Sequence, residues 1–159
     1  MATLRLSTKF RNLLLDPTAG KSWGEILKDG VIYLYSGGMP SSADAVETGT
    51  LLAKITLDGG AFTFGTTTNG LNFQTAASAA IEKSSSVTWK GDGLSTGEVG
   101  WGRFHENDGA TGASTDKARM DFDVALSGAV YNMSDTTCTL GAPVIMTNAK
   151  IELPELITF

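Results

Sequence analysis

Hydrophobic positions near the start of the chain follow the period of an α-helix. Four of them recur at i, i+4, i+7 and i+8 and therefore share one helical face: Leu6, Phe10, Leu13 and Leu14. Ser7 or Thr8 is a suitable N-cap, and an Asp-Pro pair at 16–17 ends the pattern. Ser22 and Glu25 have the spacing of a capping box, which predicts a second, shorter helix.

From Val31 onward the pattern changes to short runs of β-branched and aromatic residues, which glycine, asparagine and aspartate separate. The runs predict strands over residues 31–36, 51–57, 61–65, 71–75, 86–90, 98–104, 119–126, 129–133 and 144–153. Asp58-Gly59 and Asn69-Gly70 suit the positive φ of tight turns, so we expect a hairpin at each. Residues 75–86 are alanine-rich, and a helix is an alternative there.

Alternation within two of these runs assigns side chains to faces. In residues 144–153 the face predicted to be half-buried carries Ile145, Thr147, Ala149, Ile151 and Leu153. In residues 119–126 every second residue from Met120 is apolar, which places Asp121 and Asp123 together on the opposite face. We expect that opposite face to be solvated.

The composition fits one compact all-β domain. A chain of 159 residues has the size of a single domain, and its 18% charged residues lie below the usual share of about 25%. Lys and Arg total 12 against 17 for Asp and Glu, which argues against a nucleic-acid partner. No run is apolar enough for a signal peptide or a membrane span, so we expect synthesis in the cytoplasm without export. We predict a helical arm over residues 1–28 and a β-sandwich of jelly-roll type over residues 29–159.

The sequence predicts no catalytic, cofactor-binding or metal-binding residue. His105 is the single imidazole, and it lies in residues 102–117, where glycine, asparagine and aspartate predict an exposed, mobile loop. No serine stands in a Gly-x-Ser-x-Gly elbow that would present it as a nucleophile. Cys138, the single cysteine, forms neither an internal disulfide nor a zinc site with one histidine, and we expect it to fill a gap in the core.

Three weaker patterns have structural interpretations that we favour. Lys21 and Ser22 resemble the end of a phosphate-binding loop, but the glycine required earlier in that motif is absent, so we interpret them as the start of a helix. Asp116 with Asp121 and Asp123, or Asp108 with Asp116, could offer oxygen ligands to calcium, but neither set fits a calcium-loop spacing, so we interpret them as a solvated surface. Aromatic residues suit either a sugar-binding platform or a core, and we favour the core for Trp23, Trp89, Trp101, Tyr33, Tyr35 and Tyr131.

One stretch resembles a known family. Residues 30–57 read GVIYLYSGGMPSSADAVETGTLLAKITL, and this resembles a pattern of small virion proteins of tailed bacteriophages in which a Tyr-Ser-Gly-x-x-Pro-x-x-Ala-Asp motif precedes Thr-Gly-Thr-Leu-Leu. The similarity continues through Thr-Trp-Lys-Gly at 88–91, Gly-Trp-Gly-Arg-Phe at 100–104 and the closing Ile-Glu-Leu-Pro at 151–154. It covers nearly the whole chain, and residues 30–52 are its specific part.

The resemblance implies a non-enzymatic structural protein of the virion. The implied role is a capsid decoration, or cement, protein that stabilises the head by adding interface area between shell subunits. The implied partners are the major capsid protein, other virion proteins and further copies of the chain in a homotrimer, with no nucleic acid and no membrane. A neck, tail or fibre-base component is the alternative within this class, and a carbohydrate-binding attachment module is the alternative outside it.

The N-terminal arm has more apolar surface than one helical face needs, and basic residues lie beside it. Burial of a Leu or Phe side chain is worth about 1.5–3 kcal/mol, whether the arm docks on its own domain or on a neighbouring subunit. Both interpretations remain open. We predict that residues 1–16 make intermolecular contacts through Leu6, Phe10, Leu13 and Leu14, so that their deletion leaves a folded domain that no longer assembles.

Overall fold

The fold consists mainly of antiparallel strands. The computed structural model describes residues 2–108 and 111–153, and its 37% strand and 8% helix confirm the all-β class. The helices are α1 (Thr8–Leu15) and α2 (Trp23–Ile26). The strands are β1 (Leu4–Leu6), β2 (Val31–Ser36), β3 (Leu51–Leu57), β4 (Ala80–Glu82), β5 (Trp89–Asp92), β6 (Gly97–His105), β7 (Arg119–Ala125), β8 (Tyr131–Asn132), β9 (Thr137–Cys138), β10 (Pro143–Met146) and β11 (Lys150–Glu152). No helix in the described residues is long and apolar enough to cross a membrane.

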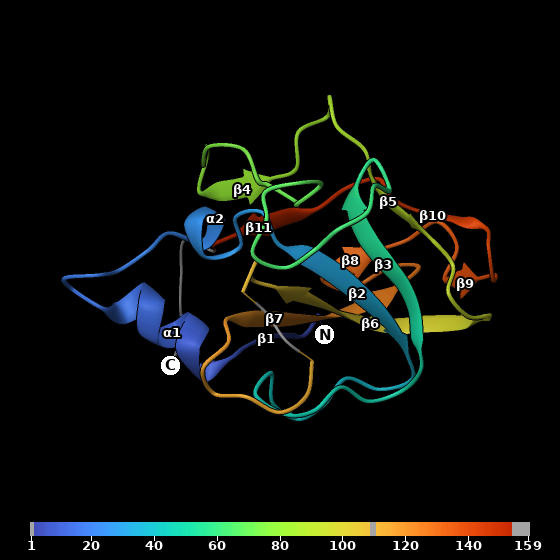
Figure 1. Ribbon diagram of the computed structural model, residues 1–159, viewed down its shortest axis with the longest axis horizontal. Coiled ribbons are helices and arrows are strands. Elements are labelled where there is room, and N and C mark those ends of the chain that lie inside the picture. The colour runs from blue at the N-terminus through green and yellow to red at the C-terminus, as the bar shows by residue number, and fades with distance from the viewer. Residues whose placement is uncertain (1, 109–110, 154–159) are drawn as a thin grey trace.

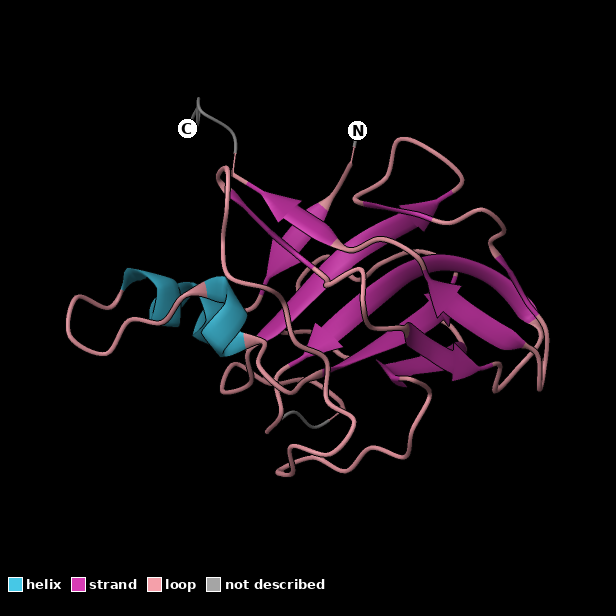
Figure 2. Ribbon diagram, turned by 90° about the horizontal axis from the view of Figure 1, so that it is seen from above, coloured by secondary structure: helices cyan, strands magenta, loops and turns pink. Residues whose placement is uncertain are grey.

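Most strands belong to one curled sheet. Its order is β1-β7-β6-β2-β3-β5-β10, with β8 beside β7 and β9 beside β6, while β4 and β11 form a separate pair. Register shifts on both sides of β2, at Tyr35, are irregularities of the kind that bend a sheet. Figures 1 and 2 show the strands arranged around an interior, with both helices at one end of the molecule. A jelly-roll connectivity stays a prediction.

The inner surface of the sheet encloses the main hydrophobic core. Residues facing it lie opposite one another across β2, β6 and β7: Ile32 pairs with Phe104, and Phe104 pairs with Met120. All three side chains are buried. Most of the predicted aromatic core is confirmed, because Trp89, Trp101, Tyr33, Tyr35 and Tyr131 are buried, whereas Trp23 is half-buried.

The N-terminal segment joins this sheet before it becomes a helix. Residues 4–6 form β1 beside β7, so Leu6 lies in a strand opposite Met120 rather than on a helical face. The helix begins after the N-cap Ser7, whose Oγ accepts a hydrogen bond from the backbone N–H of Phe10 at 3.3 Å. It ends at the C-cap Asp16, as the Asp-Pro pair predicted.

The strand predictions succeed for some runs and fail for others. β2 and β3 have the predicted bounds, but residues 61–65 form no strand. Asp58 and Asn69 do adopt positive φ, at 53° and 58°. The two predicted hairpins are nevertheless wrong, because β3 pairs with β2 and β5 instead of with the residues that follow the turn.

Residues 75–86 form a hairpin, not a helix. Phe73 bridges Lys83, and Ala77 bridges Ala80 with hydrogen bonds in both directions. The two residues of the turn, Ser78 and Ala79, have φ values of 51° and 60°. Non-glycine residues pay a steric cost in that conformation, so neither residue type signalled the turn in the sequence.

The last predicted strand is divided in two, and its first half faces the opposite way. In β10, Val144 and Met146 are buried and Ile145 is 49% exposed, so the predicted face is wrong there. Pairing with β5 explains the difference, because Met146 lies opposite the fully buried Trp89. Residues 147–149 interrupt the ladder before β11, where Ile151 is half-buried.

Candidate functional site

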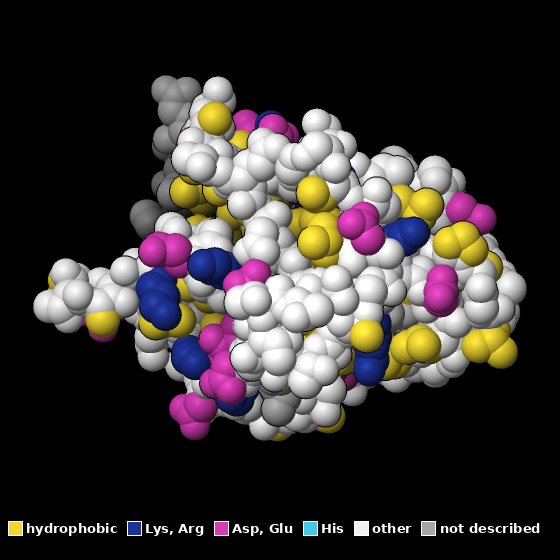
Figure 3. Space-filling model, turned by 45° about the horizontal axis from the view of Figure 1, so that its top comes forward, with side chains coloured by type: hydrophobic (Ala, Val, Ile, Leu, Met, Phe, Trp, Pro, Cys, Tyr) yellow, Lys and Arg dark blue, Asp and Glu magenta, His cyan; other side chains and the backbone are white. Residues whose placement is uncertain are grey.

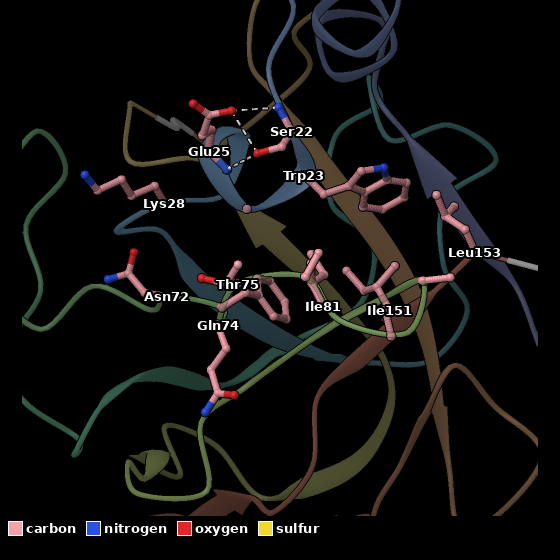
Figure 4. A pocket seen from close by; sticks show the side chains of 15 residues that line it. Ser22, Trp23, Glu25, Lys28, Asn72, Gln74, Thr75, Ile81, Ile151 and Leu153 are labelled. Carbon is pink, nitrogen blue, oxygen red and sulfur yellow. Dashed lines mark hydrogen bonds between the residues drawn. The ribbon is translucent and has the colours of Figure 1, made fainter.

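An apolar groove lies between α2 and the β4–β11 pair. Its volume is about 670 Å³, and we call it the α2 groove. Figure 4 shows the side chains of both walls directed toward the same space. The apolar side chains that line it are Trp23, Phe73, Ile81, Ile151 and Leu153.

A capping box fixes the wall that α2 provides. Ser22 Oγ accepts a hydrogen bond from the Glu25 N–H at 3.3 Å, and Glu25 Oε2 accepts from the Ser22 N–H at 2.9 Å. This confirms that Ser22 starts a helix. The short helix holds the Trp23 ring edge-on against the buried Phe10 ring, with centroids 5.0 Å apart. The indole is thereby rigidly placed, and one part of it remains exposed to the groove.

The opposite wall comes from the two-stranded pair. Ile81 and Ile151 are directly opposed in the β4–β11 ladder, and the N–H of Leu153 donates to the carbonyl of Ala79 at 3.0 Å. Because Ala79 sits in the turn with positive φ, the hairpin and the end of β11 are held together at the rim. Leu153 is 51% exposed there, so apolar surface stays open to solvent.

Two charged side chains, Glu25 and Lys28, are among the described residues that line the groove. Hydrogen bonds from the backbone and hydroxyl of Ser22 lower the pKa of Glu25, which keeps this carboxylate ionised. Asn72 is held by Asp29, through a 2.7 Å bond from its Nδ2 to Oδ1. Lys28 extends along the rim (Figure 4). An apolar hollow with a charged edge suits apolar side chains of a peptide better than a charged ligand.

A second buried layer covers the outer face of β2, β6 and β7, and in this layer an ion pair lies beside an aromatic cluster that includes Tyr33, Tyr35 and Trp101. Asp121 is fully buried, and its two oxygens accept from Arg103 Nε at 2.6 Å and Arg103 Nη2 at 2.8 Å. The prediction that Asp121 faces solvent is therefore wrong. Asp123 is half-buried, and its Oδ1 accepts from the Val130 N–H at 2.8 Å.

Residues 37–50, which we call the strap, close this layer from outside. Arg103 Nη1 donates to the Ala45 carbonyl at 3.0 Å and to Glu47 Oε1 at 2.9 Å. The other oxygen of Glu47 accepts from the Gly112 N–H at 2.9 Å, which ties the strap to the loop after β6. Trp101 Nε1 donates to the Thr48 carbonyl at 3.3 Å. The strap thus forms hydrogen bonds with polar groups that would bind water if this face were exposed to solvent.

His105 lies inside the same layer rather than in an exposed loop. It is the last residue of β6 and fully buried, with its ring 4.7 Å from the ring of Tyr33. Burial, with the positive charges of Arg103 and Arg119, lowers the pKa of His105 to about 3. The loop predicted over residues 102–117 is wrong in its first part, since residues 102–106 are buried.

The remaining candidate residues have structural roles. Cys138 is buried in β9 with Sγ 3.3 Å from the Leu52 carbonyl, and burial raises its pKa, so its expected role as a core residue is confirmed. Asp108 is exposed and pairs with Lys117 at 2.8 Å. Within residues 2–108 and 111–153, no three His, Cys, Asp or Glu side chains are grouped so that they could hold a metal ion.

The four predicted contact residues of the N-terminal segment differ in exposure. Phe10 is 0% exposed and belongs to the chain's own core. Leu6, Leu13 and Leu14 are half-buried against the same core. Leu15 is 79% exposed, so the outward part of α1 remains free to contact another molecule. Intermolecular contact by this segment stays a prediction. Phe10 itself is buried in the core of its own domain.

Other exposed leucines lie at the far end of the molecule from α1. Leu94 and Leu140 are 46% and 66% exposed, and Leu140 is fixed by a bond from its N–H to Thr96 Oγ1 at 3.1 Å. Leu126, just after β7, is 64% exposed. Figure 3 shows basic and acidic side chains close together near the projecting helical end, and hydrophobic side chains interspersed with charged ones over the opposite end.

Comparison of the chain with known proteins finds no match. No protein-family model matches the chain, and no curated protein or solved structure matches it. The function is therefore argued from the residues of this chain.

Proposed function

We propose that this chain is a non-enzymatic structural protein of a bacteriophage virion and acts as a decoration protein on the capsid. The observation that carries the proposal is the resemblance of residues 30–52 to small virion proteins of tailed phages. The major capsid protein is the proposed partner. The functional form is a homotrimer bound to the shell, after synthesis in the host cytoplasm.

The positions of the resembling residues support a structural interpretation of that motif. Ser36 Oγ accepts from the Thr50 N–H at 2.9 Å, which joins the two ends of the strap. Asp44 accepts from the N–H and the hydroxyl of Thr8, at 2.9 and 2.6 Å. Thr48 Oγ1 donates to the Gly38 carbonyl at 2.6 Å. These hydrogen bonds hold the strap over the sheet, which supports a structural role for the motif.

The distribution of exposed leucines supports a protein that bridges neighbours. Four exposed leucines follow different elements: Leu15 is the last residue of α1, Leu94 follows β5, Leu126 follows β7 and Leu140 follows β9. A cement protein gains affinity from apolar contacts at the centre of each interface with polar contacts around them. Two separated apolar surfaces allow one molecule to contact two neighbours at once.

Cryo-electron microscopy of the parent particle tests the proposal. We expect density for this fold repeated over the head surface, with several copies grouped around local three-fold positions. Density restricted to one vertex, or to the tail, would replace the proposal with a neck, tail or fibre-base role. A particle without this chain would overturn both.

A binding assay on isolated heads tests the contact surfaces. We expect Leu140→Ser and Leu15→Ser each to weaken binding, because each removes one exposed apolar anchor. Val46→Ser is the matched control, since Val46 is 57% exposed but lies on the strap. Equal binding by all three variants would show that the leucines at the two ends do not contact the shell.

A further inference from the structure

One edge of the curled sheet differs in chemistry from the other strand edges. β10 ends the strand order beyond β5, and no described strand pairs with its other side (Figure 1). Charged side chains on an edge strand oppose pairing with another chain. The edge strand β1 has Arg5 at its centre, and β11 has Lys150 and Glu152. β10 has the sequence PVIM and carries no charge.

The hydrogen-bond pattern of β10 shows which of its backbone groups face outward. The N–H of Gly93 donates to the Ala142 carbonyl at 2.8 Å. Because hydrogen-bonded pairs alternate along an antiparallel ladder, the even-numbered residues of β10 bond with β5. The odd-numbered residues, Pro143 and Ile145, direct their backbone groups away from β5. Since proline has no N–H, the N–H of Ile145 is the one outward donor of the strand.

The side chain of Ile145 lies beside this donor and is open to solvent. It is 49% exposed and lies opposite Lys90 of β5. A strand added next to β10 would bring its own side chain alongside Ile145, with the two Cα atoms about 5.5 Å apart. An apolar side chain in that position covers Ile145, whereas a charged one would lose contact with water.

A second copy of β10 supplies both matching groups. When two antiparallel copies meet about a two-fold axis at Ile145, the N–H of each Ile145 donates to the carbonyl of the other, and the two side chains lie next to each other. Lys90 then stands behind Ile145 in each copy. The two lysines are three strand spacings apart, or about 14 Å, which exceeds the screening length of about 8–10 Å. Self-pairing therefore brings no like charges together.

We propose that β10 pairs edge to edge with β10 of a second copy, antiparallel and centred on Ile145. The contact joins two chains about a two-fold axis, so it is separate from any surface that groups three chains. It goes beyond the role proposed in the virion and does not depend on it.

Amide hydrogen exchange in the full chain at rising protein concentration tests the pairing. We expect the exchange rate of the Ile145 N–H to fall as the fraction of monomer falls, with that fraction measured by sedimentation in the same samples. The N–H of Val144 is the internal control, because it bonds with β5 in the monomer and should stay protected at every concentration. An Ile145 N–H that exchanges at one rate throughout would overturn the proposal, whether or not dimers form.

Two matched substitutions separate edge pairing from general apolar contact. Ile145→Lys places like charges opposite each other across the two-fold axis, and we expect it to abolish the dimer. Leu126→Lys makes the same change at a residue that is 64% exposed and follows β7, and it should leave the dimer intact. Circular dichroism checks that both variants are folded. Any other pattern of dimer loss contradicts edge pairing at β10.

Isolated phage heads distinguish a second copy from a strand of the shell. Protection of the Ile145 N–H that appears only when heads are added would overturn the proposal, because the edge would then receive a segment of another protein. Heads that bind Ile145→Lys as tightly as they bind the unchanged chain would show that the edge contact and attachment to the shell are independent, as proposed.

Discussion

The two faces of the sheet formed by β2, β6 and β7 are both buried, but in different ways. On the inner face, Ile32, Phe104 and Met120 pack against other apolar side chains of the curled sheet. On the outer face, Arg103 and Asp121 are 0% exposed beneath the strap, which consists of loop and turn. The same three strands therefore support one apolar layer and one layer in which an ion pair lies beside aromatic side chains.

The two faces place different demands on the sequence. Apolar packing is tolerant, because another side chain of similar volume usually costs less than about 1.5 kcal/mol. A buried ion pair is demanding, since its desolvation cost is offset only if every charge and hydrogen-bonding group has a partner. The strap supplies those partners through Ala45 and Glu47.

The largest expected effect comes from a change of charge at nearly constant volume. Asp121→Asn leaves the buried Arg103 without its bidentate carboxylate, and we expect a loss of about 3–5 kcal/mol in the free energy of unfolding. Its neighbour on the opposite face provides the matched control, because Met120→Leu should cost less than about 1.5 kcal/mol. Urea denaturation measures both. Equal losses would show that the two faces are energetically alike.

The next effect separates backbone conformation from steric contact within the strap. Gly49 and Gly37 have φ values of 81° and 74°, so alanine is strained at both, by about 1–3 kcal/mol. A Cβ atom on Gly49 would also collide with the carbonyl oxygen of Ser36, whereas Gly37 has open space. We expect Gly49→Ala to destabilise the protein clearly more than Gly37→Ala in thermal unfolding. Similar melting temperatures would mean that the strap moves freely away from β2.

The inner face could be predicted from the sequence, and the outer face could not. Runs of β-branched and aromatic residues at 31–36 and 51–57 predict strands that pack on a core. Asp121 alternates with apolar neighbours in its own strand, but alternation separates two faces without showing whether a loop covers the second. The cover depends on contacts between distant residues, such as Glu47 with Gly112, which no local pattern reports.

The α2 groove illustrates the same limit. The capping box of Ser22 and Glu25 was evident, because it is local in the sequence. The opposite wall was not, since the turn at Ser78 and Ala79 contains neither glycine nor asparagine. An alanine-rich segment favours a helix when no tertiary contacts compete with that preference. Here tertiary contacts between β4 and β11 override that preference.

Acidification tests the charged layer through His105. The folded state lowers the pKa of this imidazole from 6.5 to about 3, so below pH 6.5 the unfolded chain binds a proton that the folded chain does not. Stability is therefore fully present above pH 6.5 and is lost as the pH falls toward 3, by up to about 1.4 kcal/mol per pH unit. His105→Phe should remove this part of the slope in urea denaturation at pH 7 and pH 5. An unchanged slope would assign the acid sensitivity to other groups.

The smallest expected effect concerns the link between the strap and α1. Asp44 accepts from the Thr8 N–H, one of the backbone donors that the first turn of a helix leaves unpaired, and its charge lies at the positive end of the helix dipole. We expect Asp44→Ala to cost about 1 kcal/mol and Asp44→Asn less, because the amide oxygen still accepts from Thr8. Hydrogen exchange should show faster exchange in residues 8–11 of the alanine variant, while β2 and β6 keep their protection. Faster exchange in the strap alone would show that Asp44 holds the strap and contributes nothing to the helix. Faster exchange in both would show that strap and helix open together, so that the N-terminal segment is released whenever the charged face is uncovered.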